Sequence, residues 1–237
     1  ATLTLSADQL KNGIATHSSG NHAQALAYAA KKLGIKAYIV MPKSSPQVKV
    51  DAVKGYGANV IICEANQAAR EEALNKVVAE TGAEFIHPYD DYRVITGQAT
   101  CVKELLEDVP DLDVVITPVG GGGLLCGVME GLARNQWSHI PVLAVETHGA
   151  HSLAHALNNQ NHLGIDKISS IATSLGAKKV ARKAFEEAQK KTVSNHIVSD
   201  REAVAACLQF SKDHQLVVEP ACGAALAPVY VGHPSLK

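Results

Sequence analysis

Along residues 22–145, largely apolar runs that suit buried strands alternate with stretches of helical composition. The runs cover residues 36–41, 59–63, 114–119 and 142–145, and a short extended segment covers 84–87. Continuous rather than alternating apolar character is typical of parallel strands covered on both faces. The helical stretches cover residues 22–33, 46–56, 67–80, 94–106 and 124–133, and Gly34, Gly57 and Gly82 stand at the ends of three of them. This order predicts an α/β fold with parallel sheets and helices on both faces.

The length of the chain, 237 residues, suffices for one large domain or two modest ones. The strongest strand signal, at residues 114–119, follows Pro110 and the helical stretch that ends at residue 106. We therefore expect a boundary near Pro110, with a small α/β domain over residues 1–108 and a larger domain over residues 109–237.

Four consecutive glycines, Gly120 to Gly123, lie between the strand at 114–119 and the helical stretch at 124–133. Successive glycines allow backbone N–H groups to converge on an anion, and a helix start adds a partial positive charge. A tight strand-to-helix turn, which is the alternative, needs only one or two glycines. The cluster therefore favours a phosphate-binding loop.

That phosphate could belong to a dinucleotide, because Glu146 ends the next strand, where a ribose-binding acid stands in nicotinamide-binding domains. The G-x-G-x-x-G pattern fails in every register, however, since Leu124, Leu125 and Cys126 occupy positions that require glycine. A smaller phosphate-bearing cofactor fits the loop better than NAD.

Residues 16–22 (T-H-S-S-G-N-H) gather hydroxyl, glycine and amide groups at the start of an alanine-rich helix. Ser18 or Ser19 could be an ordinary N-cap, which would account for only one of these residues. Exposed N–H groups at a helix start also bind carboxylates, such as that of an amino acid, and Asn21 adds a donor for a ring oxygen. The residues alone leave both interpretations open.

Several histidines follow Glu146, and His151 and His155 are four residues apart, which could present two imidazoles to a metal ion. No H-E-x-x-H pattern accompanies them. Exposed or half-buried histidines without a ligand are therefore the better interpretation.

Charge and composition exclude several classes of partner. The net charge is −1 and lysines and arginines do not cluster, which argues against nucleic acid or an anionic membrane surface. No apolar run reaches the roughly 18 residues that span a bilayer, and the N-terminal residues lack the basic region of a signal peptide. The five cysteines are scattered without a C-x-x-C pair, which suggests reduced thiols and a cytoplasmic location.

Taken together, these segments resemble the fold-type II pyridoxal-phosphate enzymes, in particular the serine/threonine dehydratases and the related serine racemases. The segments S-S-G-N-H-A-Q at 18–24 and V-G-G-G-G-L-L at 119–125 are similar to the family's substrate-carboxylate and phosphate loops. Residues 95–100 (I-T-G-Q-A-T) and 218–223 (V-E-P-A-C-G) are also similar to family segments. The likeness extends over nearly the whole chain, and the two loops in this order make it specific.

The resemblance implies a role for each matching residue. Ser18, Ser19, Asn21 and His22 would hold the substrate carboxylate, with Asn21 also contacting the cofactor's 3-oxygen. Gly120, Gly121, Gly122 and Gly123 would bind the phosphate of pyridoxal 5'-phosphate, which places the cofactor in the larger domain. Glu146, the Ala150 carbonyl, Ser152 and Leu175 would line a cation site, for potassium or for Mg. Ser19 matches the acid/base residue of the racemases.

Two segments of the family have no counterpart here. The family's Schiff-base lysine lies before the Ser-Ser-Gly-Asn loop in a Ser/Asn-Phe-Lys segment, whereas Lys11, the sole lysine before Ser18, lacks that context. We therefore assign no residue to that role. Residues 231–237 do not resemble the family's pyridine-facing segment either, so we expect the chain to be incomplete at both ends relative to the family.

The expected activity is that of an L-serine and L-threonine ammonia-lyase, which gives pyruvate or 2-oxobutyrate plus ammonia from a small amino-acid substrate. Serine racemisation is a second possibility, favoured by Ser19. A third is a catalytically inactive form that binds pyridoxal phosphate or an amino acid, because the lysine segment is not found. A homodimer is the expected assembly.

Overall fold

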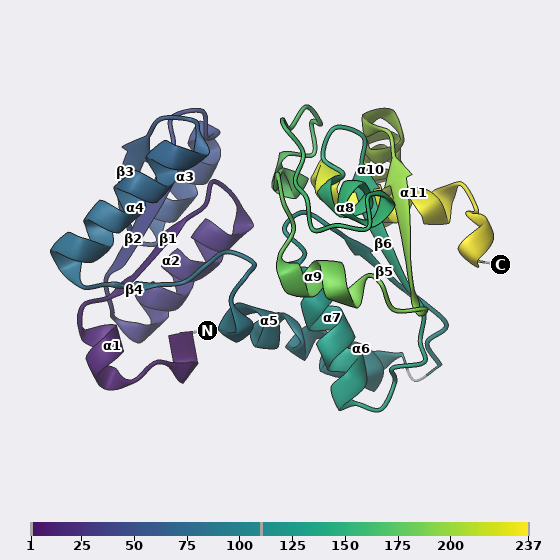
Figure 1. Cartoon of the computed structure of the whole chain (residues 1–237), viewed down its shortest axis with the longest axis horizontal. Coiled ribbons are helices and arrows are strands. Elements are labelled where there is room, and N and C mark those ends of the chain that lie inside the picture. The colour runs from purple at the N-terminus through teal and green to yellow at the C-terminus, as the bar shows by residue number, and fades with distance from the viewer. Residues whose placement is uncertain (1, 110, 237) are drawn as a thin grey trace. The chain divides into compact units, whose positions relative to one another are not determined.

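The structure is a computed structural model that describes residues 2–109 and 111–236, and it divides into two compact units (Figure 1). One unit ends at Val94 and the other begins at Ile95. This division falls earlier than the expected boundary near Pro110, a residue that lies outside the described residues. Each unit has its own sheet, and each is described separately below.

The first unit has four parallel strands in the order β3-β2-β1-β4. Its elements are η1 (Thr2–Thr4), α1 (Ala7–Lys11), β1 (Ile14–His17), α2 (Asn21–Leu33), β2 (Ala37–Pro42), α3 (Gln47–Gly55), β3 (Asn59–Cys63), α4 (Gln67–Thr81) and β4 (Glu84–Phe85). Helices α2 and α4 end at Gly34 and Gly82, both in the left-handed conformation, as the sequence predicts.

Both faces of the first sheet are covered, because successive strand residues pack into different clusters. Ile14 and Ile39 pack with Leu26 of α2 and Val53 of α3. The next residue of β1, Ala15, packs on the opposite side with residues of α4. Two buried faces explain why these strands are apolar throughout rather than alternating.

The second unit has three parallel strands in the order β5-β6-β7. Helix α5 (Tyr92–Gln98) crosses the division between the units, and it is followed by α6 (Thr100–Asp108), β5 (Val115–Pro118), α7 (Gly123–Arg134), β6 (Val142–Thr147), α8 (Ser152–Asn158), η2 (Thr173–Leu175), α9 (Arg182–Glu187), β7 (Val193–Val198), α10 (Asp200–His214), α11 (Pro220–Tyr230) and η3 (Pro234–Leu236). On one face, Leu143 and Val145 pack with α11. On the other, Glu146 bonds to backbone groups of α8. The predicted α/β class with parallel sheets and helices on both faces is confirmed.

The single helix predicted over residues 94–106 is wrong, because the structure has two helices that break at Ala99. The Thr100 hydroxyl donates to the carbonyl of Gly97 at 2.8 Å. This side-chain bond occupies an acceptor that the helical backbone would otherwise use, which favours a break at this point.

Close packing against α7 explains why residues 95–108 belong to the second unit. A Cβ added at Gly127 would lie 2.4 Å from the Cβ of Gln98, and one at Gly131 would lie 2.6 Å from the Cβ of Val102. The two glycines therefore let α5 and α6 approach the backbone of α7 more closely than any side chain would allow. This contact explains why the second unit begins at Ile95 rather than near Pro110.

Three histidines lie near the edge of the first sheet where β1 and β4 end. The ring of His17 lies 5.8 Å from that of His87 in an edge-on arrangement. Burial lowers the pKa of both imidazoles. Burial also lowers the pKa of His22, in the first turn of α2, to about 4, although a hydrogen bond to the backbone of Ile86 opposes the shift. These rings are therefore neutral in the folded protein near pH 7.

No helix within residues 2–109 and 111–236 has the length and apolar character needed to cross a membrane.

We predict that Gly131→Ala destabilises the protein by about 1–3 kcal/mol, because the new methyl group overpacks the contact with Val102. Gly55→Ala is the matched control: it lies at the end of α3, and its added Cβ would meet no atom within 4 Å. That change should be neutral or stabilising by up to about 1 kcal/mol. Urea unfolding of both variants tests the prediction. If Gly131→Ala were as stable as Gly55→Ala, α6 would move away from α7 without loss of stability.

We also predict that the free energy of unfolding falls as the pH drops from about 6.5 to about 4. In this range His22 binds a proton in the unfolded chain but stays neutral in the folded protein. The pKa of His22 in the folded state lies below its value in the unfolded chain, so its contribution is complete above pH 6.5. The loss from His22 alone is on the order of 3 kcal/mol. Urea unfolding at several pH values should show a smaller loss for His22→Asn than for the unchanged protein. His139→Asn, at an exposed position in the second unit, serves as control, and an unchanged pH dependence in His22→Asn would contradict the assignment.

Candidate functional site

The glycine loop begins where the pairing of β5 with β6 ends. The Val119 N–H still donates to the carbonyl of Val145 at 2.8 Å. After it, Gly120 to Gly122 form the connection to α7, whose first residue is Gly123. The predicted position of the loop, between a strand and a helix start, is therefore correct.

Two of these glycines are required by the space and the backbone angles. Gly122 has φ +88°, and a Cβ there would lie 2.3 Å from the Cβ of Ala184. A Cβ at Gly120 would lie 3.0 Å from the Cα of Leu175. The loop is thus clamped between α9 and η2, and its backbone has no room for side chains at these positions.

The start of α7 is open to an anion. Gly122 is the N-cap and no side chain caps the helix. In the part of the chain that the structure describes, the N–H groups of Gly120 to Gly123 donate to no protein acceptor. Free N–H groups at the positive end of a helix are the usual setting for a bound phosphate. The residues present therefore fit the phosphate of pyridoxal phosphate.

The serine-containing loop follows β1 in the first unit. The Ser18 N–H donates to the carbonyl of Val40 at 3.1 Å, which extends the β1–β2 pairing by one residue. The Ser18 hydroxyl accepts a bond of 3.3 Å from the Gly20 N–H. Ser18 and Ser19 are half-buried, whereas Asn21 is exposed.

The alternative that Ser18 or Ser19 caps helix α2 is wrong. The N-cap is Gly20, and no side chain caps the helix. Ser18 lies two residues before the cap and uses its hydroxyl within the loop, so it does not reach the first turn of α2. As at α7, the helix start stays available for an anion such as a carboxylate.

The four residues expected at the substrate carboxylate therefore fall within one short segment. Ser18 and Ser19 precede the helix, and Asn21 and His22 are its first two residues. The Nε2 atom of His22 is buried and finds no hydrogen-bond partner among the described residues.

Glu146 is fully buried at the end of β6. Its two oxygens accept bonds of 2.8 Å from the N–H groups of Leu153 and Ala154 in the first turn of α8. The side-chain amide of Asn195 on β7 donates a third bond at 3.1 Å. Burial raises the pKa of this carboxyl to about 7, while the three hydrogen bonds oppose the rise. The sequence did not predict Asn195 as a partner of Glu146. Its segment shows no strong strand pattern, and the contact depends on β7 lying next to β6.

The other residues expected around a cation lie buried in the same unit. Ala150 follows a tight turn in which its N–H donates to the Thr147 carbonyl at 2.9 Å. Ser152 begins α8, and Leu175 ends η2 next to Gly120. The cation site itself stays a prediction.

The histidines after Glu146 do not form a metal site of their own. His148 is exposed, and His151 and His155 are half-buried. The Nδ1 atom of His151 accepts a bond of 3.1 Å from the Gly149 N–H. Among the residues that the structure describes, no group of three or more His, Cys, Asp or Glu side chains could hold a metal ion.

Lys11 lies far from the serine loop within the first unit. It is exposed at the end of α1, just before β1 begins, whereas Ser18 follows the end of β1. The four residues of that strand separate the two positions by roughly 13 Å along the sheet. This placement of Lys11 agrees with the expectation that it does not bind the cofactor.

Comparisons with known proteins place the chain in a family. The family model described as "Pyridoxal-phosphate dependent enzyme" matches residues 2–237. The chain is 42% identical to the L-serine dehydratase/L-threonine deaminase of Homo sapiens, over 90% of its own length and 66% of that protein. It is 49% identical to a serine racemase of Arabidopsis thaliana, over 65% of its own length and 46% of that protein.

A solved structure agrees with this result. The structure of maize serine racemase matches with a TM-score of 0.89 and 36% identity, and the match covers 98% of this chain and 68% of the maize chain. The match therefore spans about two thirds of the human and maize proteins and 46% of the Arabidopsis protein. Because the family model matches nearly the whole chain, the chain belongs to the pyridoxal-phosphate dependent enzymes.

Proposed function

We propose that the chain is the core of an ammonia-lyase that acts on L-serine and L-threonine and releases ammonia with pyruvate or 2-oxobutyrate. The observation that carries the proposal is the uncapped glycine loop at the start of α7, which fits a phosphate group. The similarity to the human L-serine dehydratase/L-threonine deaminase supports the choice of substrate. Family membership also favours pyridoxal phosphate over the NAD alternative.

In this proposal, each loop holds one reactant. The N–H groups of Gly120 to Gly123 bind the cofactor's phosphate, and the start of α2, with Ser18, Ser19, Asn21 and His22, binds the substrate carboxylate. Asn21 also donates to the cofactor's 3-oxygen. Bound pyridoxal phosphate supplies an electron-accepting ring for chemistry at the substrate's α-carbon. The neutral state of His22, which its burial favours, lets it donate or accept a hydrogen bond without adding charge.

A cation is the second proposed ligand. Glu146, the Ala150 carbonyl, Ser152 and Leu175 would hold a monovalent ion such as potassium, or Mg. The burial of Glu146 supports the proposal, because burial raises the pKa of its carboxyl to about 7 and a cation bound next to it would favour the charged form.

Serine racemisation is the competing activity, and the similarity to serine racemases favours it. In that case the Ser19 hydroxyl would exchange a proton with the substrate's α-carbon. Incubation with L-serine separates the two activities: chiral analysis detects D-serine, and coupled assays detect pyruvate and ammonia.

A form that binds the cofactor without turnover is the third possibility. The first test is an absorbance scan with added pyridoxal phosphate, followed by borohydride reduction and peptide mapping. Cofactor fixed to a lysine would support catalysis and direct the activity assays. Reversible binding alone, with no pyruvate or D-serine formed, would support the non-catalytic form.

We further propose that the protein is a cytoplasmic homodimer. Within residues 2–109 and 111–236 no disulfide joins any of the five cysteines, which supports a reducing compartment. Light scattering of the purified chain measures the assembly directly.

We predict that Gly122→Ala weakens pyridoxal phosphate binding at least tenfold, because the methyl group would both strain a φ of +88° and collide with Ala184. Fluorescence titration with pyridoxal phosphate measures the affinity, and competition by inorganic phosphate checks that the phosphate site is affected. Gly97→Ala, at a position in the same unit where an added Cβ meets no atom within 4 Å, should leave the affinity unchanged. Equal affinities for the two variants would reject the glycine loop as the phosphate site.

We predict that Ser19→Ala weakens L-serine binding to the cofactor-loaded protein by roughly tenfold, the loss expected for one hydrogen bond to a charged group. Calorimetric titration measures the change. Ser44→Ala removes the hydroxyl of an exposed serine outside both loops and serves as control. If Ser19→Ala binds L-serine as tightly as the control, the carboxylate is held elsewhere.

A further inference from the structure

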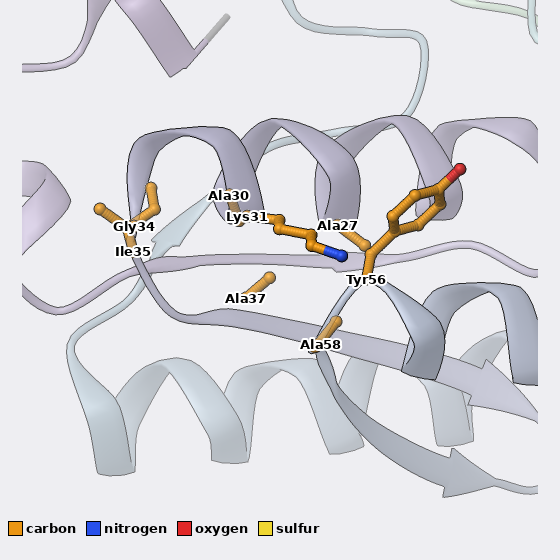
Figure 2. Close-up of a pocket in the computed structure, with 9 residues that line it drawn as sticks. Ala27, Ala30, Lys31, Gly34, Ile35, Ala37, Tyr56 and Ala58 are labelled. Carbon is orange, nitrogen blue, oxygen red and sulfur yellow. The ribbon is translucent and has the colours of Figure 1, made fainter.

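A small hollow lies in the first unit, between the second half of α2, the start of β2 and the turn that joins α3 to β3 (Figure 2). The side chain of Lys31 reaches across it toward Tyr56 (Figure 2). The alanines that line it, such as Ala30 and Ala37, are only 1% and 2% exposed. A ligand there would meet little besides the exposed Lys31, so the hollow offers too few contacts for a binding site.

Two histidines of the second unit offer more. The ring centroids of His196, on β7, and His233, in the segment after α11, are only 4.3 Å apart. Both side chains are half-buried, so a small solute reaches them. In the same unit, the rings of His148 and His151 lie farther apart, at 6.3 Å.

The backbone fixes the positions of both histidines. His196 lies within the sheet, opposite Val145 of the neighbouring strand β6. The N–H of His233 donates to the carbonyl of Pro228 in α11 at 2.9 Å. Leu236, in η3, packs against the core cluster that contains Val145. The segment after α11 is therefore anchored on the face of the sheet that carries His196.

The spacing of the two rings suits a shared metal ion. An ion bound at about 2.0–2.1 Å from an imidazole nitrogen lies roughly 3.2 Å from the ring centroid. Two imidazoles that meet at a right angle on one ion then have centroids about 4.5 Å apart, and a tetrahedral ion places them about 5.2 Å apart. The observed 4.3 Å is close to the right-angled value. Right-angled geometry is typical of Cu²⁺ and Ni²⁺, and imidazole is a suitable ligand for both.

Protonation and charge also favour a cation at this place. Burial and the neighbouring His233 lower the pKa of His196, so its ring is neutral near pH 7, which is the form that binds metal ions. The carboxylate of Glu202, in the first turn of α10, is close enough to oppose this shift. The N–H and the hydroxyl of Ser199 donate to that carboxylate at 2.6 and 2.7 Å and hold it in place. A fixed negative charge near the two rings stabilises a divalent cation between them.

We propose that His196 and His233 bind a divalent transition-metal ion of the Cu²⁺ and Ni²⁺ type. One nitrogen of each ring coordinates the ion. Water molecules complete the coordination, because no group of three or more His, Cys, Asp or Glu side chains in the described part of the chain could hold a metal ion. The bound ion links the segment after α11 to β7 and stabilises the folded protein by binding to it.

This metal site is separate from the proposed cation site around Glu146. Asn195, the residue before His196, donates to Glu146 at 3.1 Å. Successive side chains of a strand point to opposite faces of the sheet, so His196 faces away from Glu146. The ligand atoms differ as well, because oxygen atoms suit Mg whereas imidazole nitrogens suit Cu²⁺ and Ni²⁺.

Ni²⁺ is the probe for the test, and calorimetric titration of the tag-free full chain without added cofactor is the measurement. We expect one Ni²⁺ ion to bind per chain. His196→Asn and His233→Asn should each weaken the binding by at least about tenfold, because each removes one of the two protein ligands. His148→Asn is the matched control: it removes an exposed histidine of the same unit outside the pair and should leave the affinity unchanged.

Amide spectra of the full chain locate the ion independently. Paramagnetic Ni²⁺ should broaden the signals of residues next to the pair, such as Ile197 and Gly232, before those of other residues. The spectra without metal show whether each variant keeps its fold. No saturable binding, broadening centred elsewhere, or an equal loss of affinity in His148→Asn and His196→Asn would overturn the proposal. None of these results depends on pyridoxal phosphate or on turnover, so a failure of the proposed lyase function is distinguishable from a failure of this site.

Discussion

The second unit depends on backbone contacts that only glycine allows. Helix α7 meets its neighbours at Gly127 and Gly131, where an added Cβ would lie 2.4 Å and 2.6 Å from the nearest side-chain atoms. The loop before α7 is held in the same way, since Gly120 and Gly122 press against η2 and α9. One helix and the loop that starts it are thus fixed from several sides by steric contact. A phosphate-binding loop must be rigid to keep its N–H groups aimed at one point, and this packing provides the rigidity.

The two loops proposed to hold cofactor and substrate have the same local structure, although they lie in different units. In each, a parallel strand ends, a glycine serves as N-cap, and the helix that follows has no capping side chain. An uncapped helix start leaves donors without partners, which costs stability unless water or a ligand satisfies them. Ser199 caps α10 and Asn66 caps α4 with a side chain, whereas α3, α6, α8, α9 and α11 begin without a side-chain cap, as α2 and α7 do. The N-cap glycines Gly20 and Gly122 distinguish α2 and α7, because a glycine lets an anion approach the backbone N–H groups closely.

Much of this arrangement could be predicted from the sequence because its signals are local. A run of apolar residues, a glycine after a helix, and four glycines in a row each act through the backbone within a few residues. Features that depend on distant partners escaped prediction. The position of Ser18 within its loop depends on pairing with Val40, so its hydroxyl does not cap α2. Asn195 matters because β7 lies beside β6, and nothing in its own segment indicates Glu146 as its partner.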